Sequence, residues 1–400
     1  MSAKQAARPI LPGSTIGIFG GGQLGRMTAM AARAMGYRIV VLDPDPACPA
    51  RFVVDECIEA TWNDSIEAAN LGRASDVVTL EIEQIAPASM EAAASFAPVR
   101  PGGQMLAIIQ DRVEQKNWLR RNGFPVGDFV AVRSLEQLEA AIKQLGGRCF
   151  CKSATGGYDG RGQGKVGFRG EATREEIHDA WEALGCGPGV VEKAIELERE
   201  ISVMVARSPN GEVKAYPAAL NHHEHQILEW SVIPAPVSDE MQQQARTIAE
   251  EIADTFQLEG LLAVEMFVDR DGRLLINELA PRPHNSYHAS ERACQTSQFE
   301  QHVRAVCDLP LGDVDVVSPA AIVNLLGDLW IAEDGSERMP EFDAALNVPG
   351  VRLHLYEKLR PRKGRKMGHL SATGASAEEA VDRVLRAKQR LVMEAAIPQA

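Results

Sequence analysis

The stretch on which the predicted fold rests is Lys152-Ser-Ala-Thr-Gly-Gly-Tyr-Asp-Gly-Arg-Gly-Gln-Gly164. It follows a short apolar run, Arg148-Cys-Phe-Cys151, and precedes an alternating run, Lys165-Val-Gly-Phe168, so it predicts a strand, a glycine-rich loop and a second strand. Glycine tolerates positive φ and lets backbone N–H groups approach an anion, and a lysine at the end of the first strand suits phosphate.

A mobile surface hairpin is the alternative for this stretch. A simple turn needs only one or two glycines, whereas this loop has five and carries Lys152, Asp159 and Arg161. These features favour a loop that binds an anionic ligand.

The amino-acid composition limits which classes of protein the chain can belong to. The chain has 400 residues, 45 % of them hydrophobic and 24 % charged, which predicts a globular protein of two or three domains. The net charge of −13 argues against nucleic acid or a membrane surface as partner. No apolar run reaches the length of a membrane span, and the polar N-terminus lacks a signal-peptide core. The seven scattered cysteines fit a reducing cytoplasm, and Cys149 and Cys151 are expected to pack in a core.

The N-terminal region predicts a parallel βαβ unit. The strand Thr15–Phe19 precedes Gly20-Gly-Gly-Gln-Leu-Gly25, a helix is expected from Gln23 to Met35, and Arg38–Asp43 is the next strand. Gly-x-Gly-x-x-Gly alone would suggest NAD, but its physical content is only a helix N-terminus that faces an anion. A later strand, Asp76–Leu80, ends in Glu81, which is either a ligand contact at the carboxyl edge of the sheet or part of a solvated acidic loop.

The rest of the chain predicts further α/β and α+β modules. One amphipathic helix is expected from Gly102 to Asn122. A module of about 80 residues then runs from Phe124 to Val205, with Arg199–Val205 as its last strand, and is expected to move as a lid. A larger α+β body follows.

Glu265 and Glu278 lie on a predicted hairpin. If Asp271-Gly272 is its two-residue turn, outward pairing places the two glutamates directly opposite each other. Two carboxylates at that distance repel unless a cation or proton lies between them, and Mg²⁺ suits carboxylate and phosphate oxygens. The alternative is an exposed hairpin with two solvated glutamates.

Two further clusters are ambiguous. Alternation on a strand would place His223 and His225 on one face and His222 on the other, but no further ligand completes a zinc site, so we expect none. The basic run Lys358–Lys366 is either a solvated charge run or a phosphate site completed by the turn at Gly364.

Together these residues resemble the ATP-grasp superfamily and, within it, the N5-carboxyaminoimidazole ribonucleotide synthetases. The resemblance runs from about Ile16 to His369. The segments that carry it are Gly20-Gly-Gly-Gln-Leu-Gly-Arg-Met27, Gln110-Asp-Arg112 with Lys116, Lys152–Gln163, Val191-Glu-Lys193 with Glu200, Asn277-Glu-Leu-Ala-Pro-Arg-Pro-His-Asn-Ser286 and Thr296–His302. Tyr287 departs from the family, which usually has glycine there, and so does the spelling Glu81-Ile-Glu-Gln84.

The resemblance implies an ATP-grasp fold with four parts. They are a Rossmann-like N-terminal (pre-ATP-grasp) domain over 1–108, a lid module over 109–205 with a small domain at about 124–205, a body with the metal site over 206–345, and a C-terminal subdomain over 346–400.

The resemblance also implies roles at the nucleotide. Lys152 and Arg112 would contact ATP, the loop would close over its phosphates, Glu192 to Ile195 would bind adenine, Glu200 would hold the ribose, and His223 would lie near the nucleotide or bicarbonate. Glu265 and Glu278 would ligate Mg²⁺ or Mn²⁺. The full nucleotide set is Arg112, Lys152, Gly157, Tyr158, Asp159, Gly160, Arg161, Gly162, Gln163, Glu192, Lys193, Ala194, Ile195, Glu200, His223, Asn277 and Glu278.

For the second substrate, aminoimidazole ribonucleotide, the helix N-terminus near Gly22 would serve in place of an NAD site. The implied contacts are Gln23, Leu24, Glu81, Tyr158, Asp159, Arg161 and Asn285, with Lys358, Arg365 and Lys366 at its phosphate. The implied catalytic residues are Lys152, Asp159, Arg161, His223 and Arg282, and Asp159 and His223 are both candidates for the general base.

The implied activity is carboxylation of this ribonucleotide with ATP and bicarbonate, through carboxyphosphate, in purine biosynthesis, without NAD, biotin or zinc. A cytoplasmic homodimer that acts next to the mutase using its product is expected. Three rivals remain at this point: a formate-using ribonucleotide transformylase of the same superfamily, an NAD-dependent oxidoreductase, and a non-catalytic nucleotide-binding regulator.

Overall fold

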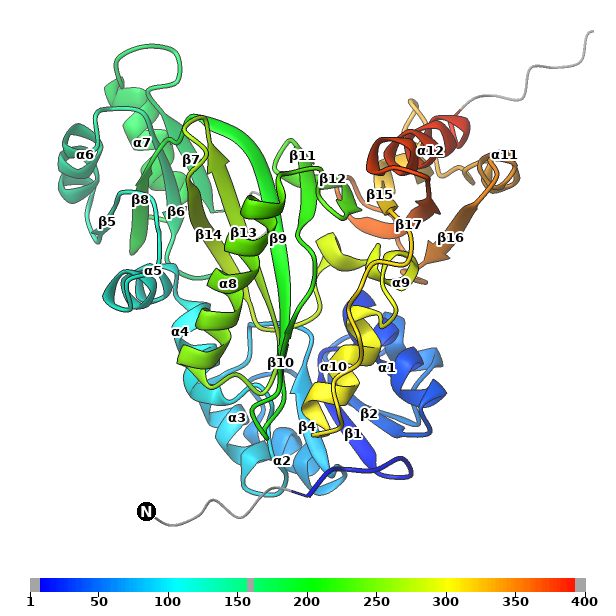
Figure 1. Ribbon diagram of the computed structural model, residues 1–400. Helices are drawn as coiled ribbons and strands as arrows, with labels where there is room; N and C mark the ends of the chain where they lie inside the picture. The colour runs from blue at the N-terminus through cyan, green and yellow to red at the C-terminus, as the bar shows by residue number, and fades with distance from the viewer. Residues whose placement is uncertain (1–7, 157–161, 393–400) are drawn as a thin grey trace, which may run out of the picture.

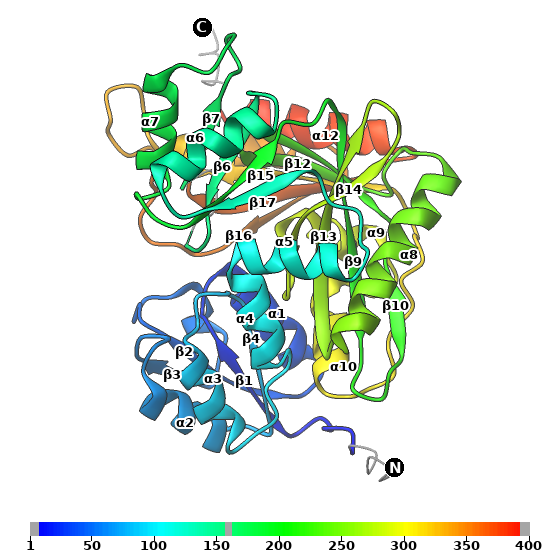
Figure 2. The same ribbon diagram turned by 90° about the vertical axis from the view of Figure 1, so that its left-hand side faces the viewer.

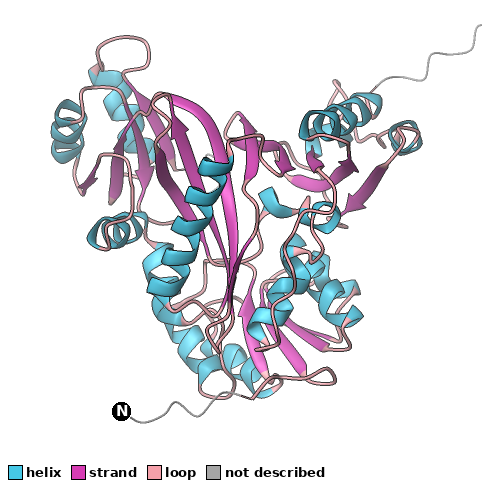
Figure 3. Ribbon diagram, in the orientation of Figure 1, coloured by secondary structure: helices cyan, strands magenta, loops and turns pink. Residues whose placement is uncertain are grey.

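The computed structural model describes residues 8–156 and 162–392. Three β-sheets organise the chain (Figures 1 and 3). The turned view places the N-terminal sheet below the other two (Figure 2).

The N-terminal unit is the predicted parallel α/β domain. Its four strands run in the order β3-β2-β1-β4, and every pair is parallel. Apolar strands such as β1 are buried throughout, as expected for a sheet covered on both faces. The elements are β1 (Thr15–Phe19), α1 (Gln23–Ala34), β2 (Arg38–Asp43), β3 (Glu56–Glu59), α2 (Ser65–Arg73), β4 (Val77–Leu80) and α3 (Pro87–Ala94). Strand β3 is not among the strands expected from the sequence.

The segment that follows is two helices, so the expectation of one helix from Gly102 to Asn122 is wrong. They are α4 (Gly103–Gln110) and α5 (Arg112–Arg121). Asp111 has extended φ and ψ of −109° and 113°, and its carboxylate accepts hydrogen bonds from the amides of Val113 and Glu114. An aspartate in this position begins a new helix instead of continuing the old one.

The small module is built on a four-stranded sheet in the order β5-β8-β6-β7, all antiparallel. Cys149 and Cys151 point into its core, as predicted. The elements are β5 (Phe129–Val132), α6 (Leu135–Gln144), β6 (Cys149–Ser153), β7 (Gln163–Val166), α7 (Arg174–Ala183) and β8 (Gly189–Lys193).

A nine-stranded sheet forms the body, in the order β14-β13-β9-β11-β12-β15-β17-β16, with β10 beside β9. β9 was expected to close the small module, but it pairs with β13 and β11 and so belongs to this large sheet. Helix α8 packs along β9 (Figure 1). The elements of this part are β9 (Leu197–Arg207), β10 (Val213–Ala215), β11 (Ala219–Glu224), β12 (Ile227–Ile233), α8 (Asp239–Phe256), β13 (Gly260–Asp269) and β14 (Leu274–Ala280).

The C-terminal part continues the same sheet, because β15 pairs with β12 on one side and with β17 on the other. Helix α10 packs against α1 of the N-terminal domain. The elements are α9 (Ser290–Ala293), α10 (Gln298–Val306), β15 (Ala320–Leu326), α11 (Phe342–Leu346), β16 (Val351–Leu355), β17 (Lys366–Thr373) and α12 (Ala377–Arg390). Among the described residues, no helix is both long and apolar enough to cross a membrane.

Candidate active site

Lys152 lies at the end of a strand–loop–strand unit, as predicted. β6 and β7 pair antiparallel, with Lys152 opposite Gln163, and the Ser153 amide donates to the carbonyl of Gly162. Within the loop, Gly162 (φ +67°) and Gln163 are described. The predicted loop residues Gly157, Tyr158, Asp159, Gly160 and Arg161 lie outside the described residues.

Two lysines converge on one buried glutamate. Glu192 Oε2 lies 3.2 Å from Lys152 Nζ and 3.6 Å from Lys116 Nζ. Burial alone raises the pKa of Glu192, but the charges of Lys116 and Lys152 outweigh it, and the net pKa is lowered. Burial lowers the pKa of Lys116. The cluster therefore holds an excess positive charge at the seam between the small and large sheets.

Lys152 also connects the small sheet to the carboxylate hairpin. Its Nζ lies 3.3 Å from Asn277 Oδ1, and Asn277 Nδ2 lies 3.4 Å from Glu265 Oε2. On that hairpin Glu265 pairs directly with Glu278, as predicted. The predicted phosphate lysine and the predicted metal carboxylates thus lie side by side.

The glutamate pair is electrostatically strained. Burial, followed by the charge of Glu278, raises the pKa of Glu265 from 4.5 to about 7. His284 contacts the same carboxylate, with Nε2 3.3 Å from Glu265 Oε1. Its Nδ1 accepts from the amide and hydroxyl of Ser286, so Nε2 carries the proton. A divalent cation between the two carboxylates would remove the repulsion, and carboxylate and amide oxygens are ligands that Mg²⁺ accepts.

His223 and Glu200 form an ion pair beside this centre. His223 Nδ1 lies 2.6 Å from Glu200 Oε2. Burial lowers the pKa of His223, but Glu200 outweighs it and the net pKa is raised. The expectation that His223 and His225 share a face is wrong. His225 lies in the turn after β11 with φ +49° and a side chain that is 92 % exposed, while His222 stacks on Trp230.

The remaining residues that the resemblance predicts at the nucleotide come from the small module and α5. Arg112 donates from its amide to Ala154 O and from Nη1 to Ser153 O, which places it at the end of β6. β8 ends at Lys193, whose side chain is mostly exposed near Asp128. The amides of Lys193 and Ala194 donate to Asp128 O and Arg148 O. These two amides are already used within the chain. The predicted adenine contacts of Glu192 to Ile195 would therefore use other backbone groups of these four residues.

The glycine-rich turn of the N-terminal domain holds carboxylates of this chain. Glu81 Oε1 accepts from the Gly22 amide at 2.6 Å, and Oε2 accepts from Leu24 and Gly25 at 3.1 and 3.0 Å. Asp43 accepts from the Gly21 amide. These amides therefore hold Glu81, and the expectation that Gln23, Leu24 and Glu81 contact the ribonucleotide stays a prediction. Burial raises the pKa of Glu81 to about 7.

Arg282 lies between the N-terminal domain and the Glu265–Glu278 carboxylate pair. Its Nε is 2.7 Å from Glu83 Oε1. Burial lowers the pKa of Arg282, but the negative charges of Glu83, Glu81 and Glu278 have the larger, opposite effect. The net pKa of Arg282 is therefore raised. The guanidinium thus faces acidic groups on both sides of the domain boundary.

Asn285 is buried, and neither its amide nitrogen nor its amide oxygen has a hydrogen-bond partner among the described residues. A buried amide without partners is costly, and a ligand with both a donor and an acceptor would satisfy it.

The basic segment folds back on itself. Lys358 Nζ donates to Lys366 O, and Arg365 Nη1 donates to Arg360 O. The charge of Lys366 contributes to lowering the pKa of His284, so Lys366 lies near the carboxylate centre. The Gly364 amide donates to Asp328. It therefore does not complete a phosphate site, as the phosphate-site alternative for Lys358–Lys366 required.

Comparison with known proteins identifies the family. Curated N5-carboxyaminoimidazole ribonucleotide synthases match almost end to end. The Bacillus subtilis protein is 41 % identical over 90 % of this chain and 92 % of its own length, and the Brucella melitensis protein is 42 % identical over 90 % and 96 %. The chain belongs to the N5-carboxyaminoimidazole ribonucleotide synthase family. This family consists of ATP-grasp ligases, so the predicted ATP-grasp fold is confirmed.

Models of three domains match successive parts of the chain. They are the ribonucleotide synthetase preATP-grasp domain at 13–110, the ATP-grasp domain at 117–299 and the phosphoribosylaminoimidazole carboxylase C-terminal domain at 320–383. A crystal structure of an N5-carboxyaminoimidazole ribonucleotide synthetase bound to ADP superposes with a TM-score of 0.87 at 39 % identity, over 97 % of this chain and all of that one. The Aspergillus clavatus synthase in complex with ADP and 5-aminoimidazole ribonucleotide gives 0.84 at 30 % identity, over 94 % and 98 %.

Sequence reasoning missed three members of this synthase site. Glu83 and His284 were left without a role, and Lys116 was quoted for the resemblance but given no contact. Glu83 lies two residues after Glu81, and His284 lies one residue before Asn285. Their closeness in the sequence to residues with predicted roles could have pointed to them. The packing of Lys116 against Glu192 joins residues 76 positions apart, and no local pattern encodes it.

Proposed function

We propose that this chain carboxylates 5-aminoimidazole ribonucleotide to N5-carboxyaminoimidazole ribonucleotide, with ATP and bicarbonate as co-substrates and ADP and phosphate as products. One observation carries the proposal beyond family membership. The contacts from Lys152 to Asn277 and from Asn277 to Glu265 join a phosphate-binding loop to a carboxylate pair. An oxidoreductase gives no account of these contacts, whereas a formate-using ribonucleotide transformylase would share the carboxylate hairpin and is separated by testing formate against bicarbonate.

The first step is attack of a bicarbonate oxygen on the γ-phosphorus of ATP. The bond to the β–γ bridging oxygen breaks, and carboxyphosphate and ADP form. Lys152 offsets the negative charge that develops on the phosphate oxygens, and Lys116 keeps Glu192 from neutralising Lys152. Bound between Glu265 and Glu278, Mg²⁺ would neutralise phosphate charge, with Asn277 held beside it by Lys152.

In the second step the exocyclic amine attacks carboxyphosphate, or CO₂ released from it, and phosphate leaves. Asn285 would orient the ribonucleotide through its unsatisfied amide, and Arg282 would hold the carboxyl donor between the domains. Because carboxyphosphate is labile in water, the Lys152–Gly164 loop would have to cover the site before carboxyphosphate forms. Asp159 would take the amine proton, because His223 is already held in an ion pair by Glu200.

The decisive assay is ADP release by the purified chain with each substrate omitted in turn. We expect release to require both bicarbonate and aminoimidazole ribonucleotide. Formate in place of bicarbonate would identify the transformylase, and ADP release that does not depend on bicarbonate would remove the carboxylase proposal. Enhanced fluorescence of NADH on mixing would instead favour an oxidoreductase.

Glu278→Gln tests the metal assignment separately. We expect Mg²⁺-dependent ADP formation to fall by about 10²–10³-fold, because one of two carboxylates that face the phosphate charge is lost. A wild-type rate would refute the metal site but leave the reaction class untouched. We further propose that Mn²⁺ substitutes for Mg²⁺, and that the chain works as a cytoplasmic homodimer next to a mutase that uses its product. Sedimentation of the purified chain tests the dimer.

A further inference from the structure

Two histidines face each other across the outermost strand pair of the large sheet. His354 of β16 and His369 of β17 are direct register partners. Their rings stack with centroids 5.0 Å apart and planes 13° apart. A directly opposed pair brings an imidazole nitrogen from each strand into one small region, within reach of a single ion.

A carboxylate completes the cluster. Glu291 comes from α9, and one ligand atom from each of Glu291, His354 and His369 lies within 4.8 Å of the others. A Zn²⁺ ion bound at about 2.0–2.1 Å keeps its ligand atoms within about 4.2 Å of one another. The side chain of Glu291 is exposed, so it is free to rotate toward the two imidazoles.

The buried ligand is held in place by a neighbour. His369 Nδ1 lies 2.9 Å from the hydroxyl of Tyr356, so its other nitrogen, Nε2, is the one that remains for an ion. Metal-binding histidines are commonly oriented by such a contact on the second ring nitrogen. Burial lowers the pKa of both His354 and His369, which favours the neutral form that binds metal.

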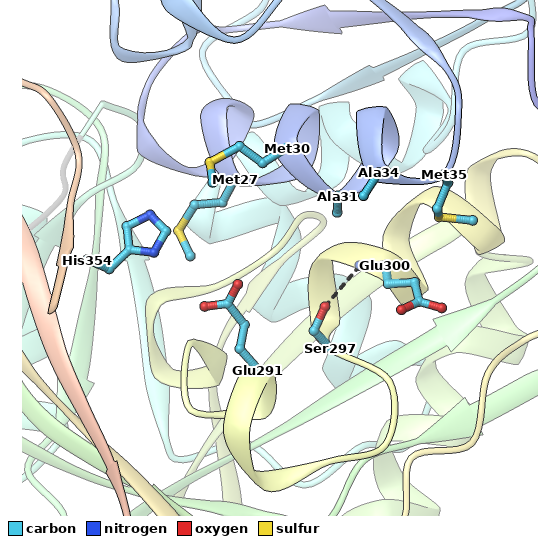
Figure 4. Close-up of a pocket in the computed structure, with 9 residues that line it drawn as sticks. All are labelled: Met27, Met30, Ala31, Ala34, Met35, Glu291, Ser297, Glu300 and His354. Atoms are coloured by element: carbon cyan, nitrogen blue, oxygen red, sulfur yellow. Dashed lines mark hydrogen bonds between the residues drawn. The ribbon is translucent and has the colours of Figure 1, made fainter. Parts of the chain in front are cut away.

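A cavity of about 380 Å³ borders this cluster on the side of helix α1. Its lining includes Glu291, His354, Met27 and Met30, and the Met27 thioether lies between the His354 ring and the Glu291 carboxylate in the close-up (Figure 4). The cavity leaves room for water or a small anion as a further ligand, and the thioethers add soft donors that suit a transition metal.

We propose that Glu291, His354 and His369 bind one divalent transition-metal ion of the Zn²⁺ class, at a site separate from the Glu265 and Glu278 carboxylates. Two imidazoles and one carboxylate favour Zn²⁺, Co²⁺ or Ni²⁺ over Mg²⁺, which prefers oxygen ligands. The ion would fasten α9 to β16 and β17. The site therefore acts on stability and is independent of the reaction proposed above.

Co²⁺ titration of the metal-free full-length chain, in excess Mg²⁺, tests the site through the visible absorption of bound Co²⁺. We expect one Co²⁺ per chain, displaced by Zn²⁺, and a higher Tm with either ion. Glu291→Gln and His354→Ala should each weaken binding by at least about tenfold. The matched control is His178→Ala, which removes an exposed histidine 3.6 Å from Glu182 and should bind as the wild type does.

Several outcomes would overturn the proposal. They are wild-type affinity in both ligand variants, no cobalt absorption in the wild type, or a near-ultraviolet thiolate band, which would place the ion at Cys48 and Cys57, whose Sγ atoms are 3.8 Å apart. If His354→Ala fails to fold, Glu291→Gln decides the question alone, because its side chain is exposed and its substitution leaves the sheet intact.

Discussion

Glu265→Gln should stabilise the chain while it abolishes the metal site. Glu265 lies opposite Glu278, its side chain is only 20 % exposed, and its pKa is raised from 4.5 to about 7, first by burial and then by Glu278. A neutral amide of the same shape removes both penalties. The variant therefore distinguishes two effects of the carboxylate pair: the stability that the fold loses by holding two carboxylates together, and the metal binding that the pair makes possible.

The magnitude follows from linkage. Each pH unit of pKa difference corresponds to about 1.4 kcal/mol, so the raised pKa of Glu265 costs about 3 kcal/mol once it is ionised in the folded state. Below about pH 4.5 both states hold the proton and the cost is absent. Between about 4.5 and 7 the unfolded state releases its proton first, so stability falls as pH rises, and above about 7 the cost is complete. Weaker contacts to Asn277 and His284 offset part of the gain, leaving about 1–3 kcal/mol.

The assay is urea unfolding without divalent cations at about pH 8 and at about pH 5. We expect the variant to exceed the wild type in free energy of unfolding at the higher pH and to match it more closely at the lower. Glu139→Gln, at an exposed position on α6, is the control and should show no pH-dependent difference. Added Mg²⁺ should raise the Tm of the wild type but not of Glu265→Gln.

Two results would refute this reasoning. If Glu265→Gln is no more stable than the wild type at about pH 8, the pair is not strained in solution. If the gain is equal at both pH values, its source is packing instead of charge. Retention of Mg²⁺-dependent ADP formation would leave the stability argument standing but remove Glu265 from the metal site.

Three further predictions concern the neighbouring contacts. Lys116→Met should destabilise the fold by about 3 kcal/mol in urea, because it leaves the Glu192 carboxylate under-compensated, and adding Glu192→Gln should recover part of the loss in a double-mutant cycle. Lys152→Met should lower kcat/KM for ATP by about 10²–10³-fold, measured by ADP release. Asp111→Ala should cost about 1 kcal/mol by urea unfolding, since the amides of Val113 and Glu114 lose their cap.

Local sequence patterns predicted the parts of the fold that local physics determines. β1 and β2 have the bounds expected from their apolar runs, and the loop between β6 and β7 is the strand–loop–strand unit that its glycines indicated. The break at Asp111 was missed because the apolar periodicity continues across it, although aspartate is a preferred helix N-cap.

Long-range pairings were beyond local patterns. Gly20–Gly25 matched a phosphate-binding turn, and its amides do bind an anion, but the anion is the carboxylate of Glu81 from the next strand of the sheet. The glycine pattern indicated that these amides bind an anion, but it did not indicate which group of the protein or of a ligand supplies that anion. The same limit applies to Lys116 and Glu192, whose contact depends on how α5 packs against β8.

The glutamate pair was placed correctly although the predicted turn was not. The turn closes by hydrogen bonds between Asp269 and Arg273, so β13 and β14 pair one residue out of the predicted register as far as Met266 and Ile276. A β-bulge at Asn277 inserts one residue and restores Glu265 opposite Glu278. Because a bulge interrupts alternation, Asn277 and Glu278 are both accessible while Ile276 and Leu279 on either side are buried. The bulge thus gives adjacent residues to one side of the sheet, which is how a single strand supplies both the contact to Lys152 and the second carboxylate.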